Sequence, residues 1–556
     1  MKSLNKKPRV VDFFCGGGGF SEGFRQQGFE VVMGIDNWAP AIETHNINHG
    51  LSDKKKDVLD FGSSLKEIEN LPNTEIIVGS PPCVLFSLSN KGGKADKTLG
   101  IKLIESFLRV IAIKKHQKSS VLAAWFMENV PNSKNYIKPV YTFRDLNLVE
   151  WAKNNKINPD KIAINGSVNG RVLNTADFGA SQKRSRFVCG EIVSNGKFPN
   201  IDAFITKEHR SIGTIKNKMP KPNMSKSLKL YSDPNYPQLK LKMTEITDHF
   251  YDSGVYASQW KSAQYAKLNH PFMGKMSFPE DEDNPSRTIM ATLSASTREA
   301  LLYKSEYNRR GDGKYRLPTI REVATLMGFP YTYQFSGGQN TKWRQIGNAV
   351  CPHMSSALAK SVRISMNLKP LEISKVSFKF PKINDTSFQN LNTFEEKKFD
   401  TPPQKKSTAR FRKHPFKEGN MTVALTNFNP SKATNSDNTG IEWYSSVFMG
   451  SGKDFVLKVI PKNGFKKIAE LILKHNSDLG NKFIKQFDKK FYEVIGKTSE
   501  FQNAYIKEKN VIHEPGKLVD EISDFISNHV PNQQFMLVPN LVPNKDKIPT
   551  KQVFAM

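Results

Sequence analysis

One cysteine and one glutamate stand at the ends of two apolar runs, and together they could do covalent chemistry. Ile76–Val78 leads into a proline-stiffened loop that holds Cys83, and Val121–Met127 ends at Glu128. A cysteine thiolate is a strong nucleophile, and a carboxyl group can polarise the ring that it attacks. The pair suits an electron-poor ring such as cytosine, in which carbon 5 accepts a methyl group only after a thiolate adds to carbon 6.

Such an addition requires positive charge near the cysteine, because a free thiol is only a few per cent ionised at neutral pH. The segment Gln182–Arg186 supplies alternating cations at the start of a predicted strand. Arg184 and Arg186 are two residues apart, so on a strand they point to the same side and can face an active site or a phosphate. Each feature alone has an ordinary alternative: a buried cysteine, a surface carboxylate or a solvated basic edge.

A glycine-rich loop near the start of the chain predicts a nucleotide-type cofactor. The buried-strand pattern Val10–Phe14 runs directly into Cys15–Gly19, and the next strand ends at Asp36. An acidic residue roughly 20 positions after such a loop can accept hydrogen bonds from ribose hydroxyls. The loop alone fits a nicotinamide cofactor and S-adenosylmethionine equally well, since Ser21 replaces the third glycine. Gly347–Val350 either completes this pocket or is an ordinary helix entry.

The charge balance points to a polyanionic partner. The chain has 556 residues and a formal net charge of +29, which favours nucleic acid over a membrane, because no stretch approaches the roughly 20 apolar residues needed to span a bilayer. A lysine-rich, AT-biased genome is the alternative explanation of the charge. We predict two or three compact domains from the length.

The cysteines and the first residues indicate a cytoplasmic protein. Cys15, Cys83, Cys189 and Cys351 lack metal-type spacing, which argues against a zinc site, any other metal site and a disulfide framework. Met1–Arg9 is basic and polar, without the pattern of a signal peptide.

The alternation of short apolar runs and longer mixed segments over residues 9–188 predicts an α/β fold with a doubly wound, mostly parallel sheet. The pattern then degrades until a helix begins after Thr319, where Glu322 gives capping-box spacing and Gly328 ends the helix. Strand-like stretches at 421–428 and 443–449 and a helix-like stretch at 465–479 predict an additional α+β domain. The expected domains are 1–189 and 319–365 (catalytic), 190–318 (an irregular module), 366–408 (a linker) and 409–556 (an accessory domain).

In their order along the chain, these segments resemble the motifs of the cytosine-5 DNA methyltransferases. The segments that carry the resemblance are Asp12–Phe20, Gly34–Asp36, Lys56–Val58, Gly79–Ser87, Glu128–Val130, Gln182–Arg186, Arg321–Glu322, Met327–Pro330 and Gln345–Val350. The resemblance spans about residues 9–365 and implies a Rossmann-like methyltransferase that uses S-adenosylmethionine, of the bacterial restriction-modification type. Two positions depart from the family pattern: Val84 replaces a glutamine, and Asn37 stands where an aromatic residue often stacks on adenine, with Trp38 one place later.

The resemblance also implies roles for single residues. Cys83 would be the nucleophile, Glu128 would contact nitrogen 3 and the exocyclic amine of a flipped-out cytosine, and Arg186 would contact the base with Arg184 supporting the loop. The residues implied in cofactor binding are Phe14, Gly16, Gly18, Asp36, Asn37, Asp57, Pro82, Asn348 and Val350.

Residues 190–318 would read the DNA sequence, with Thr288 as a candidate DNA contact or a simple strand threonine. Ser87, Arg186, Arg410 and Arg412 are further candidates, the last two because cations and aromatic residues alternate there. The accessory domain is expected to clamp DNA or contact a protein. A fused nuclease is a weaker alternative, based on Asp385 and Glu395–Lys397.

The expected partners are double-stranded DNA and, as a candidate, a cognate restriction or phage-defence protein, and we expect a monomer. Two alternatives stay open: a methyltransferase of the same type acting on tRNA, and a DNA-binding regulator that retains the fold without catalysis.

Overall fold

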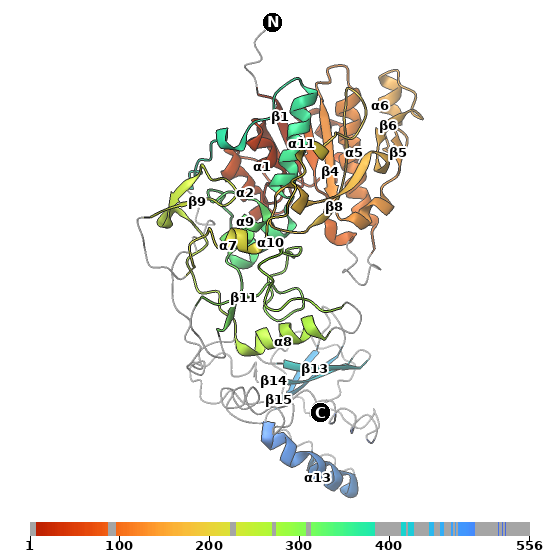
Figure 1. Ribbon diagram of the computed structural model, residues 1–556. Helices are drawn as coiled ribbons and strands as arrows, with labels where there is room; N and C mark the ends of the chain where they lie inside the picture. Colours follow the sequence, from red (N-terminus) through yellow and green to blue (C-terminus); the bar gives the residue numbers. More distant parts are fainter. Residues whose placement is uncertain are drawn as a thin grey trace. The chain divides into compact units, whose positions relative to one another are not determined.

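A computed structural model of the protein divides the chain into two compact units, residues 1–397 and 398–556. In the first unit it describes residues 7–86, 96–222, 229–269, 274–306 and 313–383. In the second it describes four strands, one helix and a few single residues between 413 and 529. Figure 1 shows these elements coloured along the chain.

The first unit is built on a six-stranded sheet. Its strands are β1 (Arg9–Phe13), β2 (Glu30–Ile35), β3 (Ile76–Gly79), β4 (Ala124–Asn129), β7 (Gly170–Asn174) and β8 (Ser185–Ile192). The order is β2-β1-β3-β4-β8-β7; the first four strands are parallel, and β8 is antiparallel to both of its neighbours. The predicted α/β fold with a mostly parallel sheet is therefore confirmed. The edge strand β7 was not predicted, because it lacks an apolar run.

Helices cover both faces of this sheet, as a doubly wound fold requires. Val10 of β1 packs in one apolar cluster with Phe24 of α1 (Gly19–Gln26), and α11 (Pro352–Ser365) joins the same cluster. The next residue, Val11, packs in a second cluster with Phe107 of α5 (Thr98–His116). Alternate residues of one strand thus face opposite cores. Gly23 lets α1 approach α11, since a Cβ there would lie 2.4 Å from Ser355.

The first unit contains further helices and short strands. Around the sheet lie α2 (Ala39–His49), α3 (Asp60–Ser63), α4 (Leu65–Glu69), β5 (Val140–Thr142), α6 (Val149–Asn154) and β6 (Ile162–Asn165). Residues 190–318 contain α7 (Ile212–Lys216), β9 (Leu230–Ser232), β10 (Lys240–Lys242), α8 (Ala257–Leu268), β11 (Tyr303–Lys304) and β12 (Tyr315–Arg316). The two strand pairs of this region form separate two-stranded sheets.

The helix predicted after Thr319 is present as α9 (Ile320–Met327), followed by α10 (Gln339–Asn348). The Thr319 hydroxyl accepts a hydrogen bond from the Glu322 amide, and the Glu322 carboxylate accepts one from the Thr319 amide at 2.7 Å, which confirms the capping box. Gly328 ends the helix with a φ of 104°, a conformation that glycine adopts without steric cost.

Glu322 also belongs to a buried ion cluster whose effect on stability can be measured. Arg316 binds both Glu322 oxygens, at 2.7 and 2.8 Å, and also pairs with Glu306. Burial by itself would raise the pKa of Glu322, but the Arg316 guanidinium outweighs burial and holds this pKa to about 2, below the usual 4.5. The ionised carboxylate therefore stabilises the fold above pH about 4.5, and this stabilisation is lost as the pH falls from 4.5 toward 2.

We predict that urea unfolding of the first unit shows a loss on the order of 3 kcal/mol from this group between pH 6 and pH 2.5. The Glu322→Gln variant should be less stable at pH 6, and its unfolding free energy should fall less steeply with acid than that of the wild type. Parallel curves for the two proteins would contradict this assignment.

The first half of the predicted linker lies against the first unit. The amide of Leu371 donates a hydrogen bond to the Gln27 side chain at 2.9 Å, and the Phe378 ring lies 4.6 Å from the ring of Tyr236. Residues 384–412, which include Asp385, Glu395–Lys397, Arg410 and Arg412, lie outside the described residues.

The second unit contains a four-stranded antiparallel sheet, in the order β13-β14-β15-β16, and a helix. Its elements are β13 (Lys413–Glu418), β14 (Met421–Thr426), β15 (Tyr444–Met449), β16 (Val456–Ile460) and α13 (Ser477–Val494). The strands predicted at 421–428 and 443–449 are confirmed as β14 and β15, and most of the helix predicted at 465–479 lies outside the described residues. Within the described part of the chain, no helix is both long and apolar enough to cross a bilayer.

Candidate active site

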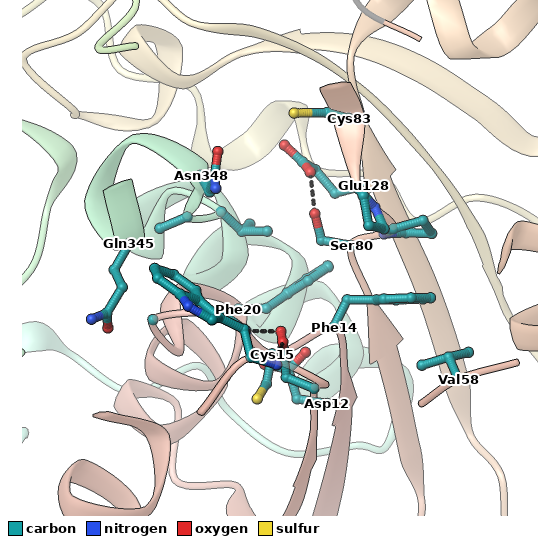
Figure 2. Close-up of a pocket in the computed structure, with 18 of the residues that line it drawn as sticks. Asp12, Phe14, Cys15, Phe20, Val58, Ser80, Cys83, Glu128, Gln345 and Asn348 are labelled. Atoms are coloured by element: carbon teal, nitrogen blue, oxygen red, sulfur yellow. Dashed lines mark hydrogen bonds between the residues drawn. The ribbon is translucent and has the colours of Figure 1, made fainter. Parts of the chain in front are cut away.

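A pocket opens at the carboxyl edge of the parallel strands, between β1 and β3, where the strand order reverses. Such a reversal creates the crevice in which doubly wound folds bind ligands. Figure 2 shows that residues from distant segments of the sequence meet here. Twelve of the thirteen residues predicted for catalysis and cofactor binding line it: Phe14, Gly16, Asp36, Asn37, Asp57, Pro82, Cys83, Glu128, Arg184, Arg186, Asn348 and Val350.

The glycine loop and Asp36 form one end of this pocket. Phe14 and Gly16 both have positive φ angles, 53° and 51°, so the chain turns sharply after β1. The Asp36 carboxylate accepts hydrogen bonds from the amides of Gly16, at 3.0 Å, and Trp38, at 2.9 Å. Burial raises the pKa of Asp36, and these amides oppose that effect. The two strand ends are thereby locked together around the site.

Gly18 is the predicted residue that does not line the pocket. It begins α1 with a φ of 79°, and a Cβ there would lie 2.2 Å from the Tyr333 hydroxyl. Gly18 allows the turn and the close packing of Tyr333, whereas Gly17 lines the pocket. A contact of Gly18 with the cofactor stays a prediction.

The loop that holds Cys83 is tied to both neighbouring strands. The Ser80 amide donates to the Phe13 carbonyl at 3.1 Å, and the Asn129 side chain donates to the Pro81 carbonyl at 2.9 Å. Cys83 begins a short 3₁₀ turn and is half-buried. Figure 2 shows its sulfur and the Glu128 carboxylate pointing in the same direction. A nucleophile and a carboxyl group are thus presented together.

Both oxygens of the Glu128 carboxylate are held in place. The Ser80 hydroxyl donates to one oxygen at 2.7 Å, and Arg186 lies 3.0 Å from the other. Glu128 is only 3% exposed and Arg186 7% exposed, so this is a buried ion pair. Removal of either side chain would leave the other as an unpaired charge in the protein interior.

Arg184 connects three parts of the first unit. Its guanidinium donates to the carbonyls of Ile289, Gly347 and Ala349, at 3.2, 2.9 and 3.3 Å. Burial, reinforced by the neighbouring Arg186, lowers the pKa of Arg184. Arg184, which directly precedes β8, and Arg186 of β8 both line the pocket, as their spacing of two residues predicts.

Several further pocket residues were not predicted as site residues, among them Asp12, Trp38, Ser80 and Arg344. Asp12 was identified as the first residue of the motif Asp12–Phe20 but was given no role of its own. Trp38 was noticed without a role, and the type of Ser80 gives no signal by itself. Arg344 lies one turn before Asn348 on α10, and this spacing on a helix could have indicated it.

The pocket fits S-adenosylmethionine, which carries positive charge. One oxygen of Asp12 accepts hydrogen bonds from the amide and hydroxyl of Ser21, whereas the other is buried without a hydrogen-bond partner. Burial raises the pKa of Asp12 to about 7, so the carboxylate would gain from a nearby cation. Asp57 also lines the pocket, and its carboxylate accepts a hydrogen bond from the Leu59 amide at 2.9 Å. Within the described residues, no cluster of three or more histidine, cysteine or acidic side chains could hold a metal ion.

The structure describes only some of the residues that were predicted to contact DNA. The Thr288 hydroxyl donates to the Lys183 carbonyl at 3.0 Å, and Thr288 lies outside any strand. The neighbouring Ile289 amide donates to the Gln182 side chain at 2.8 Å, which fastens this segment beside the pocket. Ser87, Arg410 and Arg412 lie outside the described residues, as does the side chain of Val84.

The fold and this pocket define the class of the protein as an S-adenosylmethionine-dependent methyltransferase with a Rossmann-like sheet. Residues 8–363 match the sequence profile of a family described as C-5 cytosine-specific DNA methylase, and the chain belongs to that family. The match ends before the second unit.

Known relatives are type II methyltransferases. The chain is 26% identical over 374 residues to the type II methyltransferase M.HgiDI of Herpetosiphon aurantiacus, covering 65% of this chain and 95% of the relative. It is 25% identical over 383 residues to M.AplI of Arthrospira platensis, covering 67% and 90%. Among solved structures, the S. pombe Dnmt2 methyltransferase aligns with a TM-score of 0.41 and 16% identity, covering 65% of this chain and 100% of that one.

Proposed function

We propose that the first unit methylates carbon 5 of cytosine within a specific sequence of double-stranded DNA. The observation that carries the proposal is the meeting of Cys83, Glu128 and Arg186 in one pocket with the glycine loop and Asp36. Bound S-adenosylmethionine supplies the methyl group there. Phe14, Asp36, Asp57 and the residues around Asn348 would hold it.

In the proposed reaction, the Cys83 thiolate adds to carbon 6 of the cytosine ring, which makes carbon 5 electron-rich. Glu128, which takes up a proton from solvent as the base enters, then donates a hydrogen bond to nitrogen 3 and accepts one from the exocyclic amine, so that the ring can take up the electron pair of the sulfur. Once carbon 5 carries the methyl group, its proton leaves to solvent. The electrons of that carbon–hydrogen bond then expel the thiolate and restore the aromatic ring.

Two arginines at the start of β8 support the arrangement of the reacting groups. Arg184 and Arg186 line the same pocket as Cys83. Arg186 and Ser80 also fix both Glu128 oxygens, so the carboxyl group needs little rearrangement when the base arrives.

The target carbon is stacked inside a duplex, so the cytosine must be flipped out, at a cost of a few kcal/mol offset by contacts in the pocket. We infer that residues 190–318 read the DNA sequence and that Thr288 contacts DNA beside the pocket. We also propose that the protein is a monomer and modifies DNA in a restriction-modification or phage-defence system, with a cognate restriction or defence protein as partner. The second unit would clamp DNA or contact that partner.

Incubation with tritiated S-adenosylmethionine and either duplex DNA or tRNA tests the proposal. We expect label in DNA, recovered as 5-methylcytosine after digestion, and none in tRNA. Bisulfite sequencing of the methylated plasmid should then give one recognition sequence. Label confined to tRNA, or DNA binding without transfer across many sequences, would contradict the proposed substrate or the proposed catalysis, respectively.

A further inference from the structure

Four cations line the pocket: Lys56, Arg184, Arg186 and Arg344. Three of them are already engaged by the protein. Lys56 pairs with Glu67, Arg186 pairs with Glu128, and the Arg184 guanidinium donates to three carbonyls. Among the described residues, Arg344 has no hydrogen-bonded or ion-paired partner. Arg344 is therefore the pocket cation whose guanidinium N–H groups are all available to bind an anion.

Arg344 is nevertheless held in a defined position. Its guanidinium carbon lies 4.7 Å from the centre of the Trp38 ring, a distance at which cation and ring attract each other. Trp38 is itself fixed, because its amide donates to the Asp36 carboxylate at 2.9 Å and it is the N-cap of α2. Residues that are about 300 positions apart in the sequence thus meet at one side of the pocket.

The helix that carries Arg344 lies directly on the glycine loop. A Cβ at Gly17 would lie 3.5 Å from the Cβ of Gln345, the next residue of α10. Arg344 is exposed, as is Asn348 one turn later. The guanidinium is therefore offered at a part of the pocket that a cofactor bound on the glycine loop would reach.

We propose that Arg344 binds the carboxylate of S-adenosylmethionine and that Trp38 positions Arg344 to do so. This inference rests on the proposed function, because it concerns the same cofactor site. A guanidinium and a carboxylate can form two parallel charge-assisted hydrogen bonds. Stacking on Trp38 restricts the arginine side chain before the cofactor arrives, which reduces the conformational entropy lost on binding.

The test compares two ligands that differ only by the group that Arg344 would bind: S-adenosylmethionine and decarboxylated S-adenosylmethionine. Calorimetry gives the dissociation constant of each in the absence of DNA. The Arg344→Gln variant should bind S-adenosylmethionine about tenfold more weakly than the wild type, the size of one hydrogen bond to a charged group. Its affinity for the decarboxylated ligand should stay within about twofold.

Two variants sharpen the comparison. Trp38→Leu should lower the affinity for S-adenosylmethionine about threefold more than the affinity for the decarboxylated ligand, and this difference should disappear when the change is combined with Arg344→Gln. Arg144→Gln removes an exposed arginine that pairs with Asp160 outside the pocket. It should change neither affinity, which controls for the loss of one positive charge.

The outcomes separate this inference from the proposed function. Equal weakening of both ligands by Arg344→Gln would show a general effect on the pocket and overturn the inference. Unchanged cofactor affinity with weakened DNA binding would assign Arg344 to DNA and overturn it as well. A wild-type protein that bound neither ligand would instead contradict the cofactor site itself.

Discussion

Replacing Cys83 by alanine is expected to abolish methyl transfer to DNA while leaving binding of S-adenosylmethionine intact. The sulfur forms the bond that activates the ring, and Gly79–Ser87 contains no second cysteine. Removal of an enzyme's nucleophile lowers the rate by roughly 10⁴-fold or more. Transfer of tritium to duplex DNA measures the rate, and calorimetry measures cofactor binding.

Cys189→Ala is the matched control for this prediction. Cys189 lies in the core on β8, does not line the pocket, and burial raises its pKa to about 12. This variant should keep wild-type transfer, apart from a modest loss of stability. If Cys83→Ala retained substantial transfer, the proposed covalent route would be wrong.

The second large effect is expected for Glu128→Gln, which should lower the transfer rate by roughly 10² to 10⁴-fold, the usual contribution of a positioned acid. A glutamine side chain keeps one oxygen, which can accept a hydrogen bond from Arg186 or Ser80 but not from both in the observed arrangement. It cannot release a proton toward nitrogen 3 as the sulfur donates its electron pair. Single-turnover kinetics with saturating cofactor would measure the chemical step directly.

Loss of a buried carboxylate can also destabilise the fold, so the control must share that feature. Glu191 is fully buried on β8, pairs with Lys115 and accepts a hydrogen bond from the Trp125 indole, and it does not line the pocket. Glu191→Gln should lower stability without a comparable loss of rate. Equal loss of transfer in both variants would indicate that Glu128 acts only through stability.

The central sheet and much of the pocket follow from local patterns in the sequence. Apolar runs predict β1 to β4, and the residues just after such strands meet at one edge of a parallel sheet. This reasoning brings Cys83, Glu128 and Asp36 together before any coordinates are known. The spacing of Arg184 and Arg186 predicts that their side chains point to the same side, and both residues line the pocket.

Other features depend on contacts between segments far apart in the chain, which local patterns do not contain. The partners of Arg184 are carbonyls more than 100 residues away. The stacking of Arg344 on Trp38 likewise requires α10 and the end of β2 to be neighbours. The packing of Gly18 against Tyr333 could not be predicted, because a glycine run does not reveal which of its members contacts a distant side chain.

The most direct test of the account uses duplex DNA in which 5-fluorocytosine replaces the target cytosine of the recognition sequence found by bisulfite sequencing. Fluorine at carbon 5 cannot leave as a proton does, so the bond between sulfur and carbon 6 should persist after methyl transfer. We predict a conjugate that survives denaturant and maps by mass spectrometry to the peptide containing Cys83. Absence of any conjugate on a sequence that the protein does methylate, or attachment at Cys15 in the same pocket, would contradict the account.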